Sequence, residues 1–197
     1  MTHQSKIVRT LTHPAYLYAA ALVVFCVLLQ WLGYSDSWRF DQQAIAKGHW
    51  WLLLSGNFVH LGMSHLGMNM AGLVLIVALV WAHFSVWEWA LITLVSSITV
   101  GLGLYFFDPD VLWYVGFSGS LHGLLIAGCL ADLKHYPKSA GLLLLLTVLK
   151  LAYEQWLGPV PGSESVAGGS VVVNSHLYGA LGGAVMGALL LAWRLRR

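Results

Sequence analysis

The stretch HLGMNMAGLVLIVALVWA, residues 65–82, contains no Asp, Glu, Lys or Arg and is apolar over most of its length. A helix that crosses the hydrocarbon core of a bilayer needs roughly 20 mostly apolar residues, so this stretch predicts a membrane-spanning helix. Similar stretches lie on both sides of it, at residues 15–32, 86–106, 118–133, 140–157 and 173–193. We therefore predict an all-α polytopic membrane protein, a single domain over residues 1–197 that forms a bundle of six transmembrane helices.

The composition supports a chain embedded in lipid. Of the 197 residues, 58% are hydrophobic and only 9% are charged, whereas soluble domains carry about 25% charged residues. The net charge of +2 is too near balance for a nucleic-acid-binding surface, so the expected partner is the bilayer. Nine histidines outnumber the eight acidic residues, and this excess in an apolar chain indicates a functional site.

Basic residues indicate how the chain is oriented, because cytoplasmic loops are enriched in Lys and Arg. With both termini in the cytoplasm, seven of the ten basic residues lie on that side: Lys6, Arg9, Lys134, Lys138, Arg194, Arg196 and Arg197. This predicts an N-in, C-in topology. On the far side, the long first loop (33–64) contains Trp38, Trp50 and Trp51 and is expected to lie at the membrane interface. The Gly/Ser/Pro-rich segment 158–172 is expected to be a flexible cap.

Polar residues gather at the far-side starts of the second, fourth and sixth segments: His65 and Asn69, Ser118 and His122, Asn174 and His176. Polar groups at that depth usually face a bundle interior or a water-filled cavity. Small-residue stripes continue two of these segments, Gly119, Gly123 and Ala127 on one and Gly179, Gly183 and Gly187 on the other. Such stripes let membrane helices approach closely, which would bring Ser118 near His176.

A serine beside a histidine in a desolvated pocket can act as a nucleophile with its general base. The sequence shows no Asp or Glu near either residue at this depth, so a Ser–His dyad is predicted rather than a triad. Candidate donors to the oxyanion of the tetrahedral intermediate are His65, Asn69 and the backbone N–H of Ser118.

Three motifs together resemble the signature of the rhomboid intramembrane serine proteases: HLGMSHLGMN (60–69), GFSGSLHG (116–123) and HLYGALGG (176–183). The resemblance implies a six-helix fold, Ser118 as nucleophile, His176 as general base, and His65 and Asn69 as oxyanion donors. Gly116 and Gly119 match the glycines of the GxSG motif, and His60 matches a histidine that braces the first loop. His122 stands where the family often has an aromatic residue that stacks on the catalytic histidine.

Within the family, the details GNFVH (56–60) and SGSLHG (118–123), in a minimal six-helix chain, look closest to the rhombosortase subgroup. This implies a bacterial inner-membrane protein whose active site opens to the periplasmic side and which cleaves transmembrane proteins, with C-terminal Gly-Gly sorting tails as substrates. It implies no cofactor and no metal ion. Substrate would reach the site between segments 65–82 and 140–157, and water would pass under segment 158–172. The chain departs from the family pattern in the first loop, where Trp50-Trp51-Leu52 lacks the usual arginine.

Other interpretations of these residues remain. Ser118 could simply cap the fourth helix. His60, His65, His122 and His176 could bind a metal ion or haem, or the protein could be a pseudoprotease that binds transmembrane helices without cutting them. Lys150, inside the fifth segment, would either snorkel to the interface or pair with Glu154 four residues later, or it would belong to a mobile gate whose polar side faces water.

Overall fold

The computed structural model describes residues 14–196, and helices lie over all six apolar segments. These helices are α2 (Pro14–Trp31), α6 (Met63–Val80), α7 (Val86–Phe107), α8 (Ser118–Asp132), α9 (Pro137–Leu157) and α11 (Val173–Arg194). By length and composition, α6, α7, α9 and α11 can each cross a membrane. The protein is therefore a mostly helical integral membrane protein. The six-span count and the N-in, C-in topology stay predictions, and Lys6, Arg9 and Arg197 lie outside the described residues.

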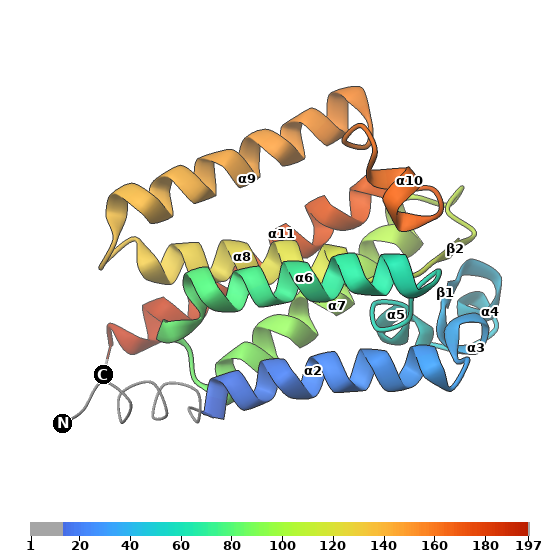
Figure 1. Ribbon diagram of the computed structural model, residues 1–197, viewed down its shortest axis with the longest axis horizontal. Coiled ribbons are helices and arrows are strands. Elements are labelled where there is room, and N and C mark those ends of the chain that lie inside the picture. The colour runs from blue at the N-terminus through green and yellow to red at the C-terminus, as the bar shows by residue number, and fades with distance from the viewer. Residues whose placement is uncertain (1–13, 197) are drawn as a thin grey trace.

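Helix α8 lies in the middle of the bundle, between α6 and α11, with α9 along one side (Figure 1). At 15 residues it is shorter than its neighbours, and most of its residues are buried. Because α8 is surrounded by other helices, its first residue, Ser118, is half-buried within the bundle. The shortness of this segment, which weakens it as a membrane span, thus fits a helix that begins within the bundle.

The close approach predicted for the two glycine stripes is confirmed. A Cβ atom added to Gly179 would lie 2.0 Å from the carbonyl oxygen of Gly119, and one added to Gly183 would lie 2.1 Å from that of Gly123. The backbones of α8 and α11 therefore pack directly against each other, which side chains would prevent. This contact fixes the distance between the two helices that carry Ser118 and His176.

The first loop folds into short elements: α3 (Ser35–Trp38), β1 (Phe40–Asp41), α4 (Gln42–Ala46) and α5 (Leu52–Ser55). Strand β1 pairs antiparallel with β2 (Trp113–Tyr114), with Phe40 opposite Tyr114. This pairing connects the first loop to the strand that precedes the GFSG motif. Trp50 and Trp51 are exposed, as expected for residues at a membrane interface.

Hydrogen bonds of Asn57 brace the first loop. The Asn57 amide donates to the backbone oxygens of Leu54 and Ser97, at 3.2 Å each. Its Oδ1 accepts a 3.2 Å hydrogen bond from the hydroxyl of Ser120, which is also 2.7 Å from the hydroxyl of Ser97. One buried network therefore joins the loop to both α7 and α8.

The segment 158–172 contains a one-turn helix, α10 (Ser163–Ala167). The hydroxyl of Ser64 at the start of α6 donates to the backbone oxygen of Val166 at 2.5 Å. The segment predicted to be a flexible cap is thus partly helical and is hydrogen-bonded to α6.

The largest hydrophobic core lies among α2, α6, α7 and α8. It includes the rings of Trp81, in the 3-10 turn η1 (Trp81–His83), and Trp89, which stack with centroids 3.9 Å apart. At the same end, Arg194 of α11 forms an ion pair with Glu88 at the start of α7. These contacts hold together the end of the bundle opposite Ser118.

Candidate active site

Ser118 and His176 come together where α8 and α11 begin. The Oγ atom of Ser118 lies 2.9 Å from Nε2 of His176, within hydrogen-bonding distance. Phe117 is the N-cap residue of α8, and no side chain makes a capping hydrogen bond there. The interpretation of Ser118 as a helix cap is therefore wrong, and its hydroxyl bonds to the imidazole instead.

The prediction that no acidic residue lies near this pair is also wrong. An oxygen of the Glu154 carboxylate lies 2.9 Å from Nδ1 of His176, and Glu154 is only 3% exposed. Glu154 is close to the end of α9, so it lies at the same level as the first turn of α11. The sequence contained a usable signal: a Lys/Glu pair on an apolar span is costly unless it faces the bundle interior.

The pairing of Lys150 with Glu154 is confirmed, at 2.8 Å between Nζ and the carboxylate. The structure adds two contacts that sequence spacing did not indicate. The Lys150 ammonium is 2.8 Å from Nε2 of His122 and 3.2 Å from Nδ1 of His176. The polar side of α9 therefore faces the histidines of α8 and α11. Whether α9 acts as a gate stays a prediction.

The ring of His122 lies against the ring of His176, with centroids 4.4 Å apart and planes inclined by 23°. Its Nδ1 is 2.7 Å from the backbone oxygen of Ser118. Because a carbonyl oxygen only accepts hydrogen bonds, Nδ1 carries the proton and Nε2 is free to accept one from Lys150. His122 thus occupies the stacking position, and both of its nitrogens are hydrogen-bonded.

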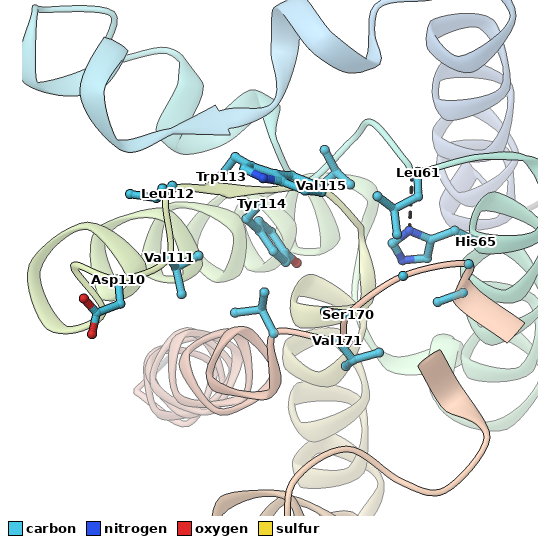
Figure 2. Close-up of a pocket in the computed structure, with 14 residues that line it drawn as sticks. Leu61, His65, Asp110, Val111, Leu112, Trp113, Tyr114, Val115, Ser170 and Val171 are labelled. Atoms are coloured by element: carbon cyan, nitrogen blue, oxygen red, sulfur yellow. Dashed lines mark hydrogen bonds between the residues drawn. The ribbon is translucent and has the colours of Figure 1, made fainter. Parts of the chain in front are cut away.

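On α6, the ring of His65 is held in one orientation beside the GFSG motif. The backbone N–H of Leu61 donates to Nδ1 of His65 at 3.4 Å (Figure 2), so the ring proton is on Nε2, where it can be donated. Gly116 has φ +129°, and an added Cβ would lie 2.7 Å from Cε1 of His65. Only glycine leaves room there for the imidazole.

Asn69 lies one helical turn after His65 and is buried. Its side-chain amide donates to the backbone oxygen of His65 at 3.1 Å, which uses one of its two amide hydrogens.

Gly119 has a packing role, because an added Cβ would lie 2.7 Å from the backbone oxygen of Ser175 on α11. Asn174 was expected at the same membrane depth as His176, but it does not face the other site residues. Its amide donates to the Asp108 carboxylate at 2.6 Å instead.

His60 is fully buried, and its ring lies edge-on to His65 with centroids 5.1 Å apart. Within residues 14–196, neither of its ring nitrogens has a hydrogen-bond partner. The hydrogen bonds that brace the first loop come from Asn57 instead. Burial, with a smaller contribution from His65, lowers the pKa of His60 to about 3, so its ring is neutral at physiological pH.

A cleft of about 490 Å³ opens beside His65. One wall is residues 110–115, which include β2, and the other is residues 167–172. Figure 2 shows His65 and Leu61 at one end, with Ser170 and Val171 facing the strand that carries Tyr114. Each of the two walls is a run of six consecutive residues, which gives an extended peptide a surface to contact on both sides.

The side chains of this site that could serve as metal ligands do not fit a metal ion. His122, Glu154 and His176 each present one ligand atom, all within 4.8 Å of one another. The Lys150 ammonium lies 2.8–3.2 Å from atoms of these same three side chains. A metal ion would need to displace this cation. The four histidines suggested as ligands also lie as two ring pairs, His60 with His65 and His122 with His176.

The chain is similar to known proteins over most of its length. The Rhomboid domain family model matches residues 47–193, which include all the site residues described above. The chain is also similar to the protein "Rhomboid protease GluP" of Bacillus subtilis (strain 168), with 24% identity over 193 residues. That match covers 89% of this chain and 38% of the relative, so the chain spans well under half of that protein's length. Since the family model covers most of the chain, including both helices that form the serine–histidine pair, the protein belongs to the rhomboid family.

Proposed function

We propose that this protein is an intramembrane serine endopeptidase that cleaves membrane proteins in or near a transmembrane segment. The observation that carries the proposal is the 2.9 Å hydrogen bond between Ser118 Oγ and His176 Nε2, which is partly buried where α8 and α11 begin. Family membership supports it, and so does similarity to a relative named as a protease.

In the proposed reaction, Nε2 of His176 takes the hydroxyl proton as Ser118 Oγ attacks the carbonyl carbon of the scissile bond. The tetrahedral oxyanion accepts hydrogen bonds from Nε2–H of His65, the free amide hydrogen of Asn69 and the backbone N–H of Ser118. His176 then donates its proton to the leaving nitrogen. Water, deprotonated by the same imidazole, hydrolyses the acyl-enzyme and releases Ser118.

The substrate would bind as an extended segment in the cleft between residues 110–115 and 167–172, with His65 at its end. An unwound segment suits this site because a helix hides its peptide carbonyls in its own hydrogen bonds. Access would be lateral, between α6 and α9, with water coming from the cleft. These are the routes that the family resemblance implies.

The decisive experiment is a cleavage assay with purified protein and a transmembrane substrate in liposomes. Ser118→Ala and His176→Ala should each abolish cleavage, and a fluorophosphonate probe should label the wild-type protein but not Ser118→Ala. Matched controls are Ser139→Ala, on the exposed start of α9, and His135→Ala, whose ring stacks on His83. Full activity in Ser118→Ala or His176→Ala would overturn the proposal.

We also propose the rhombosortase-type specificity: cleavage of C-terminal tails with a Gly-Gly motif, at the periplasmic face of a bacterial inner membrane. The test is co-expression with a membrane substrate that carries such a tail, compared with the same substrate after Gly-Gly→Leu-Leu replacement. Processing of the first substrate alone supports this specificity. Equal processing of both, or of neither, refutes it and leaves the general rhomboid activity to the liposome assay.

A further inference from the structure

We propose that Glu154 is a positioning residue for His176: its carboxylate holds the imidazole in the tautomer whose Nε2 can accept the proton of Ser118. The site would then work with three residues from three helices, α8, α9 and α11, rather than as a dyad. This inference rests on the proposed function and names a further residue for the same reaction.

Two groups with opposite requirements contact Nδ1 of His176. The Glu154 carboxylate, at 2.9 Å, only accepts hydrogen bonds, while the Lys150 ammonium, at 3.2 Å, only donates them. If Nδ1–H donates to Glu154, the lone pair of His176 is on Nε2 and faces Ser118. If Lys150 donates to Nδ1, the proton is on Nε2 and His176 cannot act as a base.

The other contacts of Lys150 favour the productive tautomer. Its ammonium lies 2.8 Å from Glu154 and 2.8 Å from Nε2 of His122, both shorter than its distance to His176. The lone pair of His122 is available because its Nδ1–H donates to the backbone oxygen of Ser118. As long as Glu154 is a carboxylate, Lys150 therefore has two better partners than Nδ1 of His176.

The carboxylate also acts after the proton has moved. When His176 becomes an imidazolium, a charge forms in a buried position, and the Glu154 oxygen 2.9 Å from Nδ1 stabilises it. Glu154 is 3% exposed, so water contributes little there. Lys150 balances the carboxylate before the reaction, which makes the buried charge acceptable in the resting protein.

The location of Glu154 couples catalysis to the position of α9. Only Ala140, Thr147, Leu151 and Glu154 are buried among the 21 residues of this helix, so α9 is held to the bundle through few side chains. If α9 moves away to admit a substrate, His176 loses the partner of Nδ1. His176 is held in its reactive tautomer only when α9 is packed against α8 and α11 again.

The first test replaces the carboxylate with an amide of the same size. In liposomes with the full-length protein, Glu154→Gln should lower kcat by about 10²- to 10⁴-fold while KM changes by less than about threefold. Gln155→Ala, at the next and exposed position of α9, is the control and should keep wild-type kinetics. Wild-type kcat in a folded Glu154→Gln protein would overturn the proposal.

The second test separates tautomer control from a merely structural role. Without the carboxylate, Lys150 is the remaining charged group at Nδ1, so the double variant Glu154→Gln/Lys150→Met should be at least about tenfold more active than Glu154→Gln alone. If Glu154 only stabilises the fold, the second substitution can restore activity only as far as it restores stability by removing an unpaired buried charge, so thermal unfolding is measured on both variants and kcat is compared between folded samples. A double variant no more active than the single one counts against the inference.

Two further measurements keep the inference testable if Glu154→Gln folds poorly. Glu154→Asp keeps the charge and should be more active than Glu154→Gln, whereas equal activities would contradict the role of the charge. Long-range ¹H–¹⁵N NMR of labelled histidines, without substrate, should show His176 protonated at Nδ1 in the wild type. A wild-type signal with the proton on Nε2 refutes the inference, whereas loss of cleavage in Ser118→Ala would still support the proposed function.

Discussion

Replacing Gly179 with alanine tests whether the contact between α8 and α11 sets the geometry of the active site. The new Cβ would lie 2.0 Å from the backbone oxygen of Gly119, while real Cβ contacts essentially never fall below 3.0 Å. The three atoms nearest to this Cβ all belong to the backbone of Gly119, so no side chain can rotate away. The two helices must separate by about 1 Å at this point, because dense packing leaves no other adjustment.

That separation acts directly on the hydrogen bond proposed for catalysis. Gly119 follows Ser118 on α8, and Gly179 is one turn after His176 on α11. A shift of about 1 Å would lengthen the 2.9 Å distance between Ser118 Oγ and His176 Nε2 beyond the range of a hydrogen bond. Misplacement of this size can cost about 10²-fold in rate. Alanine is the better helix former, so a loss of activity would come from the clash alone.

The assay is cleavage of a transmembrane substrate in liposomes, with thermal unfolding measured on the same samples. Gly141→Ala is the matched control, since the nearest atom to its added Cβ is a Leu133 methyl carbon at 3.9 Å. Gly187→Ala should lie between the two, because its Cβ would be 2.9 Å from the Cβ of Ala127. A folded Gly179→Ala protein with kcat/KM within about twofold of wild type would refute the reasoning.

Three further substitutions probe other parts of the site. Gly116→Ala should lower kcat/KM by about 10²-fold or more, because the added Cβ would displace the ring of His65 and the φ of +129° disfavours alanine; wild-type kinetics would contradict this role. Asn57→Ala removes buried hydrogen bonds of the first loop and should lower the free energy of unfolding by about 2–3 kcal/mol, measured by chemical denaturation. The third, His60→Gln, tests an effect of pH on stability. Since burial lowers the pKa of His60 from 6.5 to about 3 in the folded protein, the unfolded chain binds the extra proton below pH 6.5, and His60 should contribute about 2 kcal/mol to the fall in wild-type stability between pH 8 and pH 5. The His60→Gln protein should show a correspondingly smaller fall in the same denaturation series, and an identical fall would show that His60 is not its source.

Much of the fold follows from local sequence patterns. Apolar runs located the six long helices to within a few residues, because exclusion of charge from lipid acts on each segment separately. The glycine stripes indicated that α8 and α11 would touch, since small residues at four-residue spacing create a flat helix face. The order of the residues and these two rules were enough to place Ser118 beside His176.

The sequence was less informative about which way polar side chains point. Asn174 and His176 are at the same level of α11, yet Asn174 binds Asp108 and His176 faces Ser118. Spacing along a helix gives depth in the membrane, but the rotation of the helix about its axis depends on its neighbours. Glu154 was missed for this reason.

The sequence by itself therefore determined the helices, their order, the family motifs and the serine and histidine that we propose to react. Only the tertiary structure decided which groups surround that pair: Glu154 and Lys150 from α9, and His122 stacked on His176. The physical reason is that membrane burial of a helix depends on its own residues, whereas hydrogen bonds between helices depend on the packing of all of them. A charged pair in an apolar span is acceptable only where such packing supplies partners, and here those partners are the histidines of the site.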